Sequence, residues 1–169
     1  NGLGLAETFL ASGMKINGAS IYGNGHRYVH VEIDDVASQF NFPLMIPQSE
    51  TERLLTEHLA SSGIYVEREV ELISFAQGEN GVTGELRRAD GASEKFNASW
   101  LVGCDGAHSA VRHGLALEFE GSAEPNDWML ADVHMKGPIA GNEVSVYWHE
   151  KGLLVFFPIT PGRYRMVAD

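Results

Sequence analysis

One segment of the sequence, residues 100–112, combines residue types that could hold a phosphate-bearing cofactor. Its order predicts a buried strand, a tight turn and a helix that starts at Ser109. Such a unit points backbone N–H groups and the positive end of a helix dipole at one place, which suits an anion. Gly106 lets a ligand approach the backbone where a Cβ would clash, and Asp105 offers acceptors for a ribose hydroxyl or for nearby amides. The same residues could also form a plain strand-to-helix turn that binds nothing.

Other residue types capable of chemistry form no recognisable pattern. The seven histidines include no His-Glu-x-x-His sequence. His26 and His30, four residues apart on a probable strand, are separated by about 13 Å. We therefore expect no bound metal. Cys104 stands near a helix start, where a thiol can become reactive, but is more simply a small buried residue of the strand. We expect His108 to be exposed.

The first third of the sequence predicts two helices around a pair of strands. A short amphipathic helix covers residues 2–13, and we expect its last glycine to end it in the left-handed conformation. Two strands lie within residues 14–33 and meet at a Gly-Asn-Gly turn. Ser49 and Glu52 form a capping box that predicts the start of a second helix, which Gly63 ends.

The rest of the sequence is dominated by strand patterns. Residues 64–75, 82–88 and 96–102 predict a β-meander whose last strand is buried and leads into the turn. Three strands follow within residues 128–158, and residues 163–169 look like a strand cut off at its end. The expected fold is α+β, with a mixed, largely antiparallel sheet flanked by two or three helices.

Composition narrows the possible partners and compartments. Twelve Lys and Arg against 23 Asp and Glu give a formal net charge of −11, which argues against a nucleic acid or an anionic membrane as partner. No apolar run approaches the roughly 18–20 residues of a membrane helix. A single cysteine and no signal-peptide pattern favour the cytoplasm. The sequence does not begin with Met, so we expect a piece of a larger protein.

The segment 102–112, Val-Gly-Cys-Asp-Gly-Ala-His-Ser-Ala-Val-Arg, resembles the DG motif of the FAD-dependent aromatic hydroxylases. These are the class A flavoprotein monooxygenases of the p-hydroxybenzoate hydroxylase type. Residues 47–55 look like the family's segment in which a glutamine near the flavin opens a helix. Residues 119–121 follow the motif at the expected distance. Three further stretches look like the strands of the family's substrate domain: residues 130–133, 157–158 and 163–165.

Two of the family's motifs are missing from the sequence. The Gly-x-Gly-x-x-Gly unit fails because Glu7 and Tyr28 stand where the third glycine belongs, and no second Gly-Asp motif is present. The resemblance therefore implies a middle fragment. Residues 1–47 would be substrate-domain strands and a leading helix, residues 48–118 a remnant of the FAD-binding domain, and residues 119–169 the truncated substrate-domain sheet.

The resemblance implies a monooxygenase that uses FAD and NAD(P)H to hydroxylate a phenolic or polyketide-like aromatic through a flavin hydroperoxide. The fragment alone would be inactive. The resemblance identifies no general base. The residues that it places at or beside the cofactor are Gln48, Asp105, Gly106, Ala107, Ser109 and Arg112.

Three aromatic residues of the C-terminal strands, Tyr147, Trp148 and Phe157, could line a pocket for an aromatic substrate or form the core of the sheet. Two other functions stay open. One is a related flavin-dependent reductase or halogenase, and the other is a non-catalytic sheet or binding module. In a fragment, the surface that faces the cofactor would lack its cover and could mediate self-association.

Overall fold

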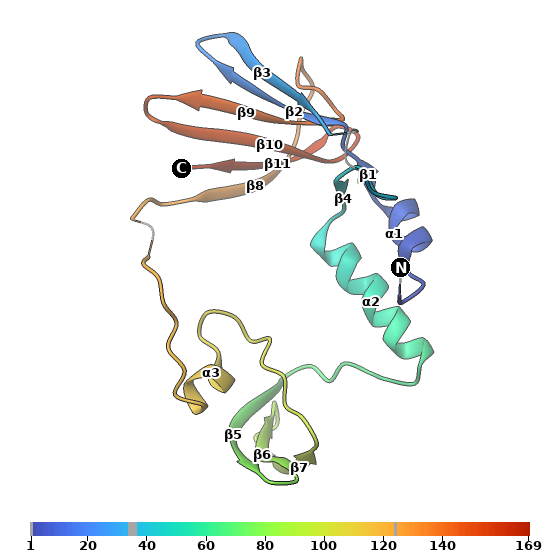
Figure 1. Cartoon of the computed structure of the whole chain (residues 1–169), viewed down its shortest axis with the longest axis vertical. Coiled ribbons are helices and arrows are strands. Elements are labelled where there is room, and N and C mark those ends of the chain that lie inside the picture. The colour runs from blue at the N-terminus through green and yellow to red at the C-terminus, as the bar shows by residue number, and fades with distance from the viewer. Residues whose placement is uncertain (1, 34–36, 124) are drawn as a thin grey trace. The chain divides into compact units, whose positions relative to one another are not determined.

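A computed structural model describes residues 2–33, 37–123 and 125–169 and divides the chain into two compact units. The first unit contains Asn1–Ile64 and Glu124–Asp169, and the second contains Tyr65–Ala123. Mostly antiparallel sheets with few helices make the fold α+β, as expected (Figure 1). Within the described ranges, no helix is long and apolar enough to cross a membrane.

The first unit is built on a six-stranded sheet in the order β3-β2-β9-β10-β11-β8. Its strands are β2 (Gly18–Gly23), β3 (His26–Glu32), β8 (Met129–His134), β9 (Glu143–His149), β10 (Gly152–Thr160) and β11 (Arg163–Ala168). All neighbours are antiparallel except β2 and β9, which pair in parallel. This parallel pair joins the N-terminal hairpin to the C-terminal strands.

The turn between β2 and β3 confirms the predicted hairpin. Asn24 and Gly25 have φ angles of +51° and +78°. A turn with two successive positive φ angles matches the right-handed twist of the strands on either side, and asparagine and glycine adopt such angles at the lowest cost.

Strand alternation gives the six-stranded sheet two faces of different character. One, the tyrosine face, carries Tyr22 of β2, Tyr147 of β9, Phe156 of β10 and Tyr164 of β11. The rings of Tyr22 and Tyr147 stack at 5.0 Å, and Phe156 contacts Tyr147 and Tyr164 edge-on at 5.9 and 6.5 Å. These rings form an aromatic core.

The opposite side, the arginine face, carries Asp132, Phe157, Arg163 and Arg165. Trp148 belongs to this face too, because it pairs with Leu153, two positions before Val155 and four before Phe157 on β10. Successive residues of a strand point to opposite faces, so Trp148 and its neighbour Tyr147 cannot lie on the same one.

The first unit also contains α1 (Ala6–Ser12), a short strand pair formed by β1 (Met14–Lys15) and β4 (Leu44–Met45), and α2 (Gln48–Ser61). The expected left-handed conformation of Gly13 is wrong, since its φ is −111° and its backbone is extended. A glycine is required there for space, because an added Cβ would come within 2.6 Å of Leu44 Cγ.

The predicted capping box of α2 is also wrong. Pro47 occupies the N-cap position, two residues before Ser49, without a side-chain hydrogen bond, and the helix begins at Gln48. Glu52 instead accepts a hydrogen bond from Gln48 Nε2 at 2.9 Å. Gly63 has a φ of +75° and ends the helix as predicted.

The second unit contains an antiparallel meander of β5 (Val70–Gly78), β6 (Gly81–Arg88) and β7 (Ser93–Ala98), followed by α3 (Ala110–Gly114). The strand expected to begin at residue 64 begins at Val70 instead. Glu69 has a φ of +58°, outside the range of extended backbone, so the strand cannot continue through it.

The predicted buried strand before the turn is wrong as well. β7 ends at Ala98, and Trp100 and Val102 are 86% and 78% exposed. Among the described residues, no strand pairs with residues 100–105, so this segment has neither ladder partners nor a covering layer.

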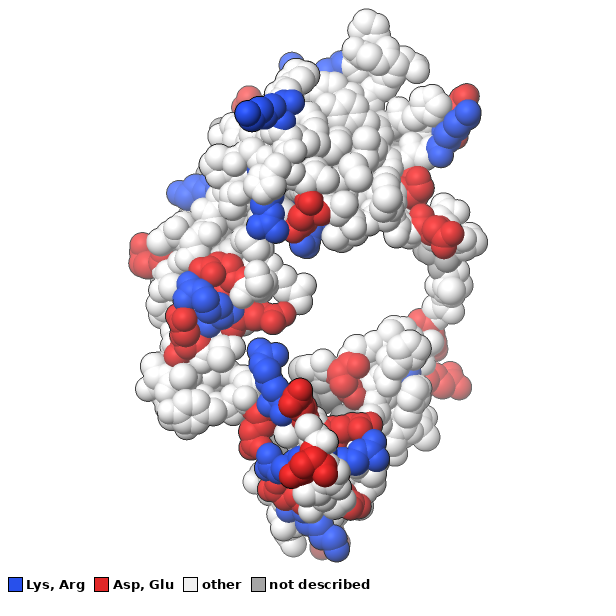
Figure 2. Space-filling model, turned by 180° about the vertical axis from the view of Figure 1, so that it is seen from behind, with Lys and Arg blue, Asp and Glu red and all other residues white. Residues whose placement is uncertain are grey.

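Acidic and basic side chains are intermixed over the meander, which lies at the lower end of Figures 1 and 2. Arg87 pairs with Glu71 at 2.6 Å, and Arg88 pairs with Glu67 at 3.0 Å and with Glu94. Glu67 and Glu71, at the two ends of the acidic run 67–71, are thus partners of these arginines. Such exposed pairs add little stability, so packing must hold the meander together.

Gly84 of β6 tests that packing. An added Cβ would lie 2.5 Å from the Phe96 ring and 2.6 Å from the Ser74 carbonyl oxygen, and that backbone oxygen cannot move aside cheaply. We expect Gly84→Ala to lower the free energy of unfolding in urea by about 1–3 kcal/mol. Gly78→Ala is the matched control, since its Cβ would meet only Gly81 oxygen at 3.9 Å. Equal stability of the two variants would contradict the packing described.

Candidate functional site

The turn of the second unit is organised around the carboxylate of Asp105. The Ser109 hydroxyl donates to Oδ1 at 2.5 Å, and the amides of Ala110 and Val111 donate to Oδ2 at 2.6 and 3.3 Å. Ser109 Oγ in turn accepts from the Arg112 amide at 3.0 Å. The amides that begin α3 therefore have acceptors within the motif. The predicted anion site at these amides is wrong, because the chain's own carboxylate occupies it.

These contacts also set the charge of the turn. The hydrogen bond from Ser109, supported by the amides of Val111 and Ala110, outweighs desolvation and lowers the pKa of Asp105 below its ordinary value. Asp105 therefore stays ionised at neutral pH and holds the start of α3 in place.

The outer side of the turn is open. Gly106 has a φ of +76°, and an added Cβ would meet no atom within 4 Å. Within the described part of the chain, the amides of Gly106, Ala107 and His108 donate no hydrogen bond, whereas Gly106 oxygen accepts from the Ser109 amide at 3.1 Å. The turn thus presents backbone N–H groups beside a glycine without a side chain, a form that fits the phosphate or ribose part of a dinucleotide.

The side chain of Arg112 braces this turn. Its Nη1 donates to the Ala107 carbonyl at 2.8 Å, and its guanidinium lies 4.7 Å from the centroid of the Phe119 ring. The resemblance places Arg112 at or beside the cofactor, and this geometry shows it bracing the motif. Phe119 belongs to the Phe-Glu-Gly segment that follows the motif.

Cys104 and His108, beside the turn, are both exposed. Exposure of His108 matches its prediction. The predicted burial of Cys104 is wrong, since the strand that would have buried it does not form. Within the described ranges, no group of three or more His, Cys, Asp or Glu residues is arranged to hold a metal ion.

A second candidate site lies in the first unit, on the arginine face. Here β4 contacts β10, and a cavity of about 250 Å³ opens between the segment before α2 and the sheet. Its lining residues are Met45, Ile46, Pro47, Phe157, Ile159 and Arg165. Phe157 and the residue that precedes Gln48, both singled out in the sequence, therefore meet in one cavity.

The three predicted pocket aromatics are not brought together. Phe157 lines the cavity, while Trp148 is 66% exposed on the same face, beside a separate concavity with Tyr28 and Val29. Tyr147 lies on the tyrosine face, where burial raises the pKa of its hydroxyl above the ordinary value. Tyr147 is thus a residue of the aromatic core.

Sequence reasoning missed Arg165 and Asp132 as site residues. Arg165 Nε donates to Asp132 Oδ1 at 2.9 Å, and Arg163 Nη2 donates to Oδ2 at 2.9 Å. The available signal was the Arg-x-Arg pattern on a strand, which places two cations on one face. Their partner lies 31 and 33 residues earlier in the chain, beyond the reach of local patterns.

A Ser, His and Glu group on the tyrosine face lacks the geometry of a catalytic triad. Ser20 Oγ and Glu143 Oε2 both approach the same ring nitrogen of His30, Nδ1, at 2.9 and 3.2 Å. In a triad the serine and the acid occupy opposite ring nitrogens. Ser20 is fully buried, so this group serves to tie β2, β3 and β9 together.

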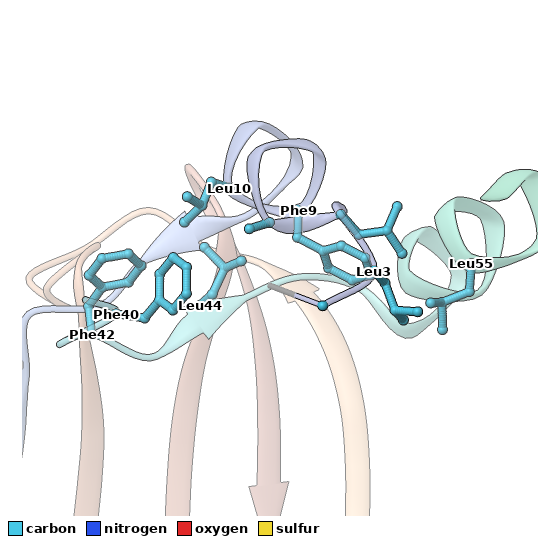
Figure 3. A pocket seen from close by; sticks show the side chains of 10 residues that line it. Leu3, Phe9, Leu10, Phe40, Phe42, Leu44 and Leu55 are labelled. Carbon is cyan, nitrogen blue, oxygen red and sulfur yellow. The ribbon is translucent and has the colours of Figure 1, made fainter. Parts of the chain in front are cut away.

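An apolar cavity of about 670 Å³ lies between α1, β4 and α2 (Figure 3). Its labelled side chains are Leu3, Phe9, Leu10, Phe40, Phe42, Leu44 and Leu55. The described residues that line it include no charged or hydrogen-bonding side chain that could orient a ligand or carry out chemistry.

Comparison with known proteins identifies the family to which the chain belongs. A family model described as "FAD binding domain" matches residues 1–167. The chain is 34% identical over 169 residues to 6-methylpretetramide 4-monooxygenase of Streptomyces rimosus, covering 98% of this chain and 30% of that protein. Pentachlorophenol 4-monooxygenase of Sphingobium chlorophenolicum is 28% identical over 171 residues, covering 99% and 32%. The chain thus spans about a third of the length of these curated relatives.

Solved structures share the fold. The p-nitrophenol 4-monooxygenase PnpA of Pseudomonas putida superposes with a TM-score of 0.85 at 17% identity, covering 98% of this chain and 44% of that one. The match extends over both units and therefore includes both candidate sites. The chain belongs to the FAD binding domain family and is a member of the FAD-dependent aromatic hydroxylases.

Proposed function

We propose that this chain is part of an FAD-dependent monooxygenase that uses NAD(P)H and hydroxylates a phenolic or polyketide-like aromatic. The observation that carries the proposal is the turn at residues 105–108, in a chain of the FAD binding domain family. Its glycine has open space around it, and the N–H groups of residues 106–108 donate no hydrogen bond to any described residue. Relatives named as monooxygenases of aromatic compounds support the reaction. A flavin-dependent halogenase, CmlS, matches with a TM-score of 0.79 at 19% identity, a likeness of fold alone.

In this proposal each residue of the turn has its own task. The amides of Gly106 and Ala107 contact the dinucleotide, and the absent side chain of Gly106 allows the close approach. Asp105 and Ser109 hold the turn in shape, and Arg112 braces it through the Ala107 carbonyl. Gln48 lies near the flavin at the start of α2. When bound, FAD supplies the electron transfer between NAD(P)H and O2 that side chains cannot supply.

The cavity at Phe157 receives the aromatic ring of the substrate. An apolar cavity of about 150 Å³ already accommodates benzene, so the space at Phe157 suits one substituted ring. Apolar walls on several sides exclude water from the bound ring. The proposal includes two domains: residues 1–47 and 119–169 form a substrate domain, and residues 48–118 form part of a FAD-binding domain. It also includes a cytoplasmic location.

Gly106→Val tests the cofactor role. In the enzyme that carries this chain, we expect the variant to lose bound FAD, measured by the flavin absorbance that remains after gel filtration. Gly91→Val is the matched control, because Gly91 has a φ of +83° and equally open surroundings in the same unit. Both variants place valine at a similar positive φ angle, so a difference in flavin content between them reports a cofactor role of Gly106. Wild-type flavin content in Gly106→Val would contradict the proposal.

Asp105→Asn tests the carboxylate that shapes the turn. Because the pKa of Asp105 is lower in the folded chain, its contribution to stability is complete above the unfolded value of about 3.9 and disappears as pH falls through the folded value. We expect the stability difference between wild type and variant, measured by urea unfolding, to stay constant from about pH 5 to about pH 8 and to shrink below about pH 4.

Asp90→Asn serves as the control for this measurement, since among the described residues Asp90 accepts a single amide hydrogen bond, from Ala92 at 2.9 Å. Its stability difference from wild type should be smaller at neutral pH. A difference for Asp105→Asn that grows on acidification would contradict the role assigned to the carboxylate.

We also propose that the exposed apolar segment before the turn mediates self-association of the isolated chain. Trp100 and Val102 are both highly exposed there. We expect the double variant Trp100→Ser/Val102→Ser to elute later than wild type in size-exclusion chromatography at high concentration and identically at low concentration. Trp128→Ser is the control, as Trp128 is exposed in the first unit. A monomeric wild type at both concentrations would rule this out.

A further inference from the structure

The cavity at Phe157 is bordered by a row of three side chains that lie directly opposite one another across neighbouring strands. Phe157 of β10 pairs with Arg165 of β11, and Arg165 pairs with Asp132 of β8. Directly paired residues share one face and contact each other. Arg165 therefore lies between Phe157 and Asp132 on one face of the sheet, and its guanidinium is ion-paired with the Asp132 carboxylate.

The charges around this row do not cancel, because Arg163, which lies outside the row, also pairs with Asp132. One carboxylate thus faces two guanidiniums, which leaves one surplus positive charge beside the cavity. The two guanidiniums hold the pKa of Asp132 below its ordinary value, so the carboxylate stays ionised at neutral pH. None of the described residues that line the cavity is acidic. In a chain with a formal charge of −11, a surplus cation at an apolar cavity is a local exception.

Asp132 also determines how Arg165 is turned. Arg165 directs Nε and Nη2 at the carboxylate, at 2.9 and 3.4 Å. Its third nitrogen, Nη1, donates no hydrogen bond to any residue that the structure describes. A guanidinium fixed through one edge presents its remaining N–H groups in a defined direction, and such groups bind an anionic oxygen strongly.

We propose that Arg165 is a specificity-determining residue that binds an anionic oxygen, phenolate or carboxylate, of the ring that enters the Phe157 cavity. Asp132 is the positioning residue that orients it. This inference rests on the proposed function and adds to it a charge requirement on the substrate. Phe157 and Pro47 provide the apolar walls, and Arg165 distinguishes a charged ring from a neutral one of similar size.

The test measures binding of three ring probes to the FAD-loaded enzyme by equilibrium dialysis. The probes are 4-nitrophenol above its pKa, 4-nitrobenzoate and the neutral 4-nitroanisole. We expect wild type to bind at least one of the two anions about tenfold more tightly than 4-nitroanisole. Arg165→Gln should remove this preference and leave 4-nitroanisole affinity unchanged. The better of the two anions identifies whether phenolate or carboxylate is the source of the oxygen.

Two results would overturn the proposal. One is a wild type that binds 4-nitroanisole as tightly as either anion, or that binds no anionic probe. The other is an Arg165→Gln variant that weakens all three probes equally, since that pattern indicates lost packing. Flavin content is measured on the same samples. If flavin content is normal, either result refutes the role of Arg165 but leaves the proposed function standing. A wild type that contains no flavin refutes the proposed function.

Asp132→Asn separates orientation from charge. Removing the carboxylate raises the local positive charge, so a purely electrostatic effect would tighten anion binding. Loss of orientation instead predicts that the preference for the anion falls at least about threefold. Tighter anion binding by Asp132→Asn would overturn the positioning role. His134→Asn, a change on the same strand outside the cavity lining, is the control and should keep the wild-type preference.

Discussion

The candidate cofactor site depends on one carboxylate. Asp105 accepts hydrogen bonds from the Ser109 hydroxyl and from the first amides of α3, and in doing so it fixes where the helix begins. Those amides already have acceptors within the motif, so the open side of the turn is formed by the residues that precede them. There Gly106 adopts a conformation that other residues rarely tolerate. The groups left for a ligand are therefore the amides of the turn and not those of the helix.

The substrate side depends on a different constraint, the alternation of side chains along strands. Tyr147 and Trp148 are adjacent in sequence but point to opposite faces, one into an aromatic core and one away from it. The same rule aligns Phe157, Arg165 and Asp132 on a single face across three strands. The sheet thereby separates a stabilising face from a face that combines an apolar cavity with a surplus positive charge.

Local signals in the sequence were sufficient where structure is determined within a few residues. The Asn24 and Gly25 turn, the Gly63 helix end and the turn at Gly106 all follow from glycine and asparagine conformations, and all three are present. Predictions failed where partners decide the outcome. Residues 100–102 have strand-like composition but no strand to pair with among the described residues, so they form no strand, and Trp100 and Val102 are exposed. Arg165 escaped notice because its significance comes from Asp132, whose position opposite it is a matter of strand register.

In the proposed function, the open amides of residues 106–108 bind the cofactor, whereas those of residues 110–112 hold the start of α3. Amide hydrogen exchange measured with and without FAD, in the enzyme that carries this chain, separates these two groups of amides. Residues 110–112 should be protected in both states, and residues 106–108 should become protected only when FAD is added. Protection of residues 106–108 that does not change on addition of FAD would contradict the proposed function.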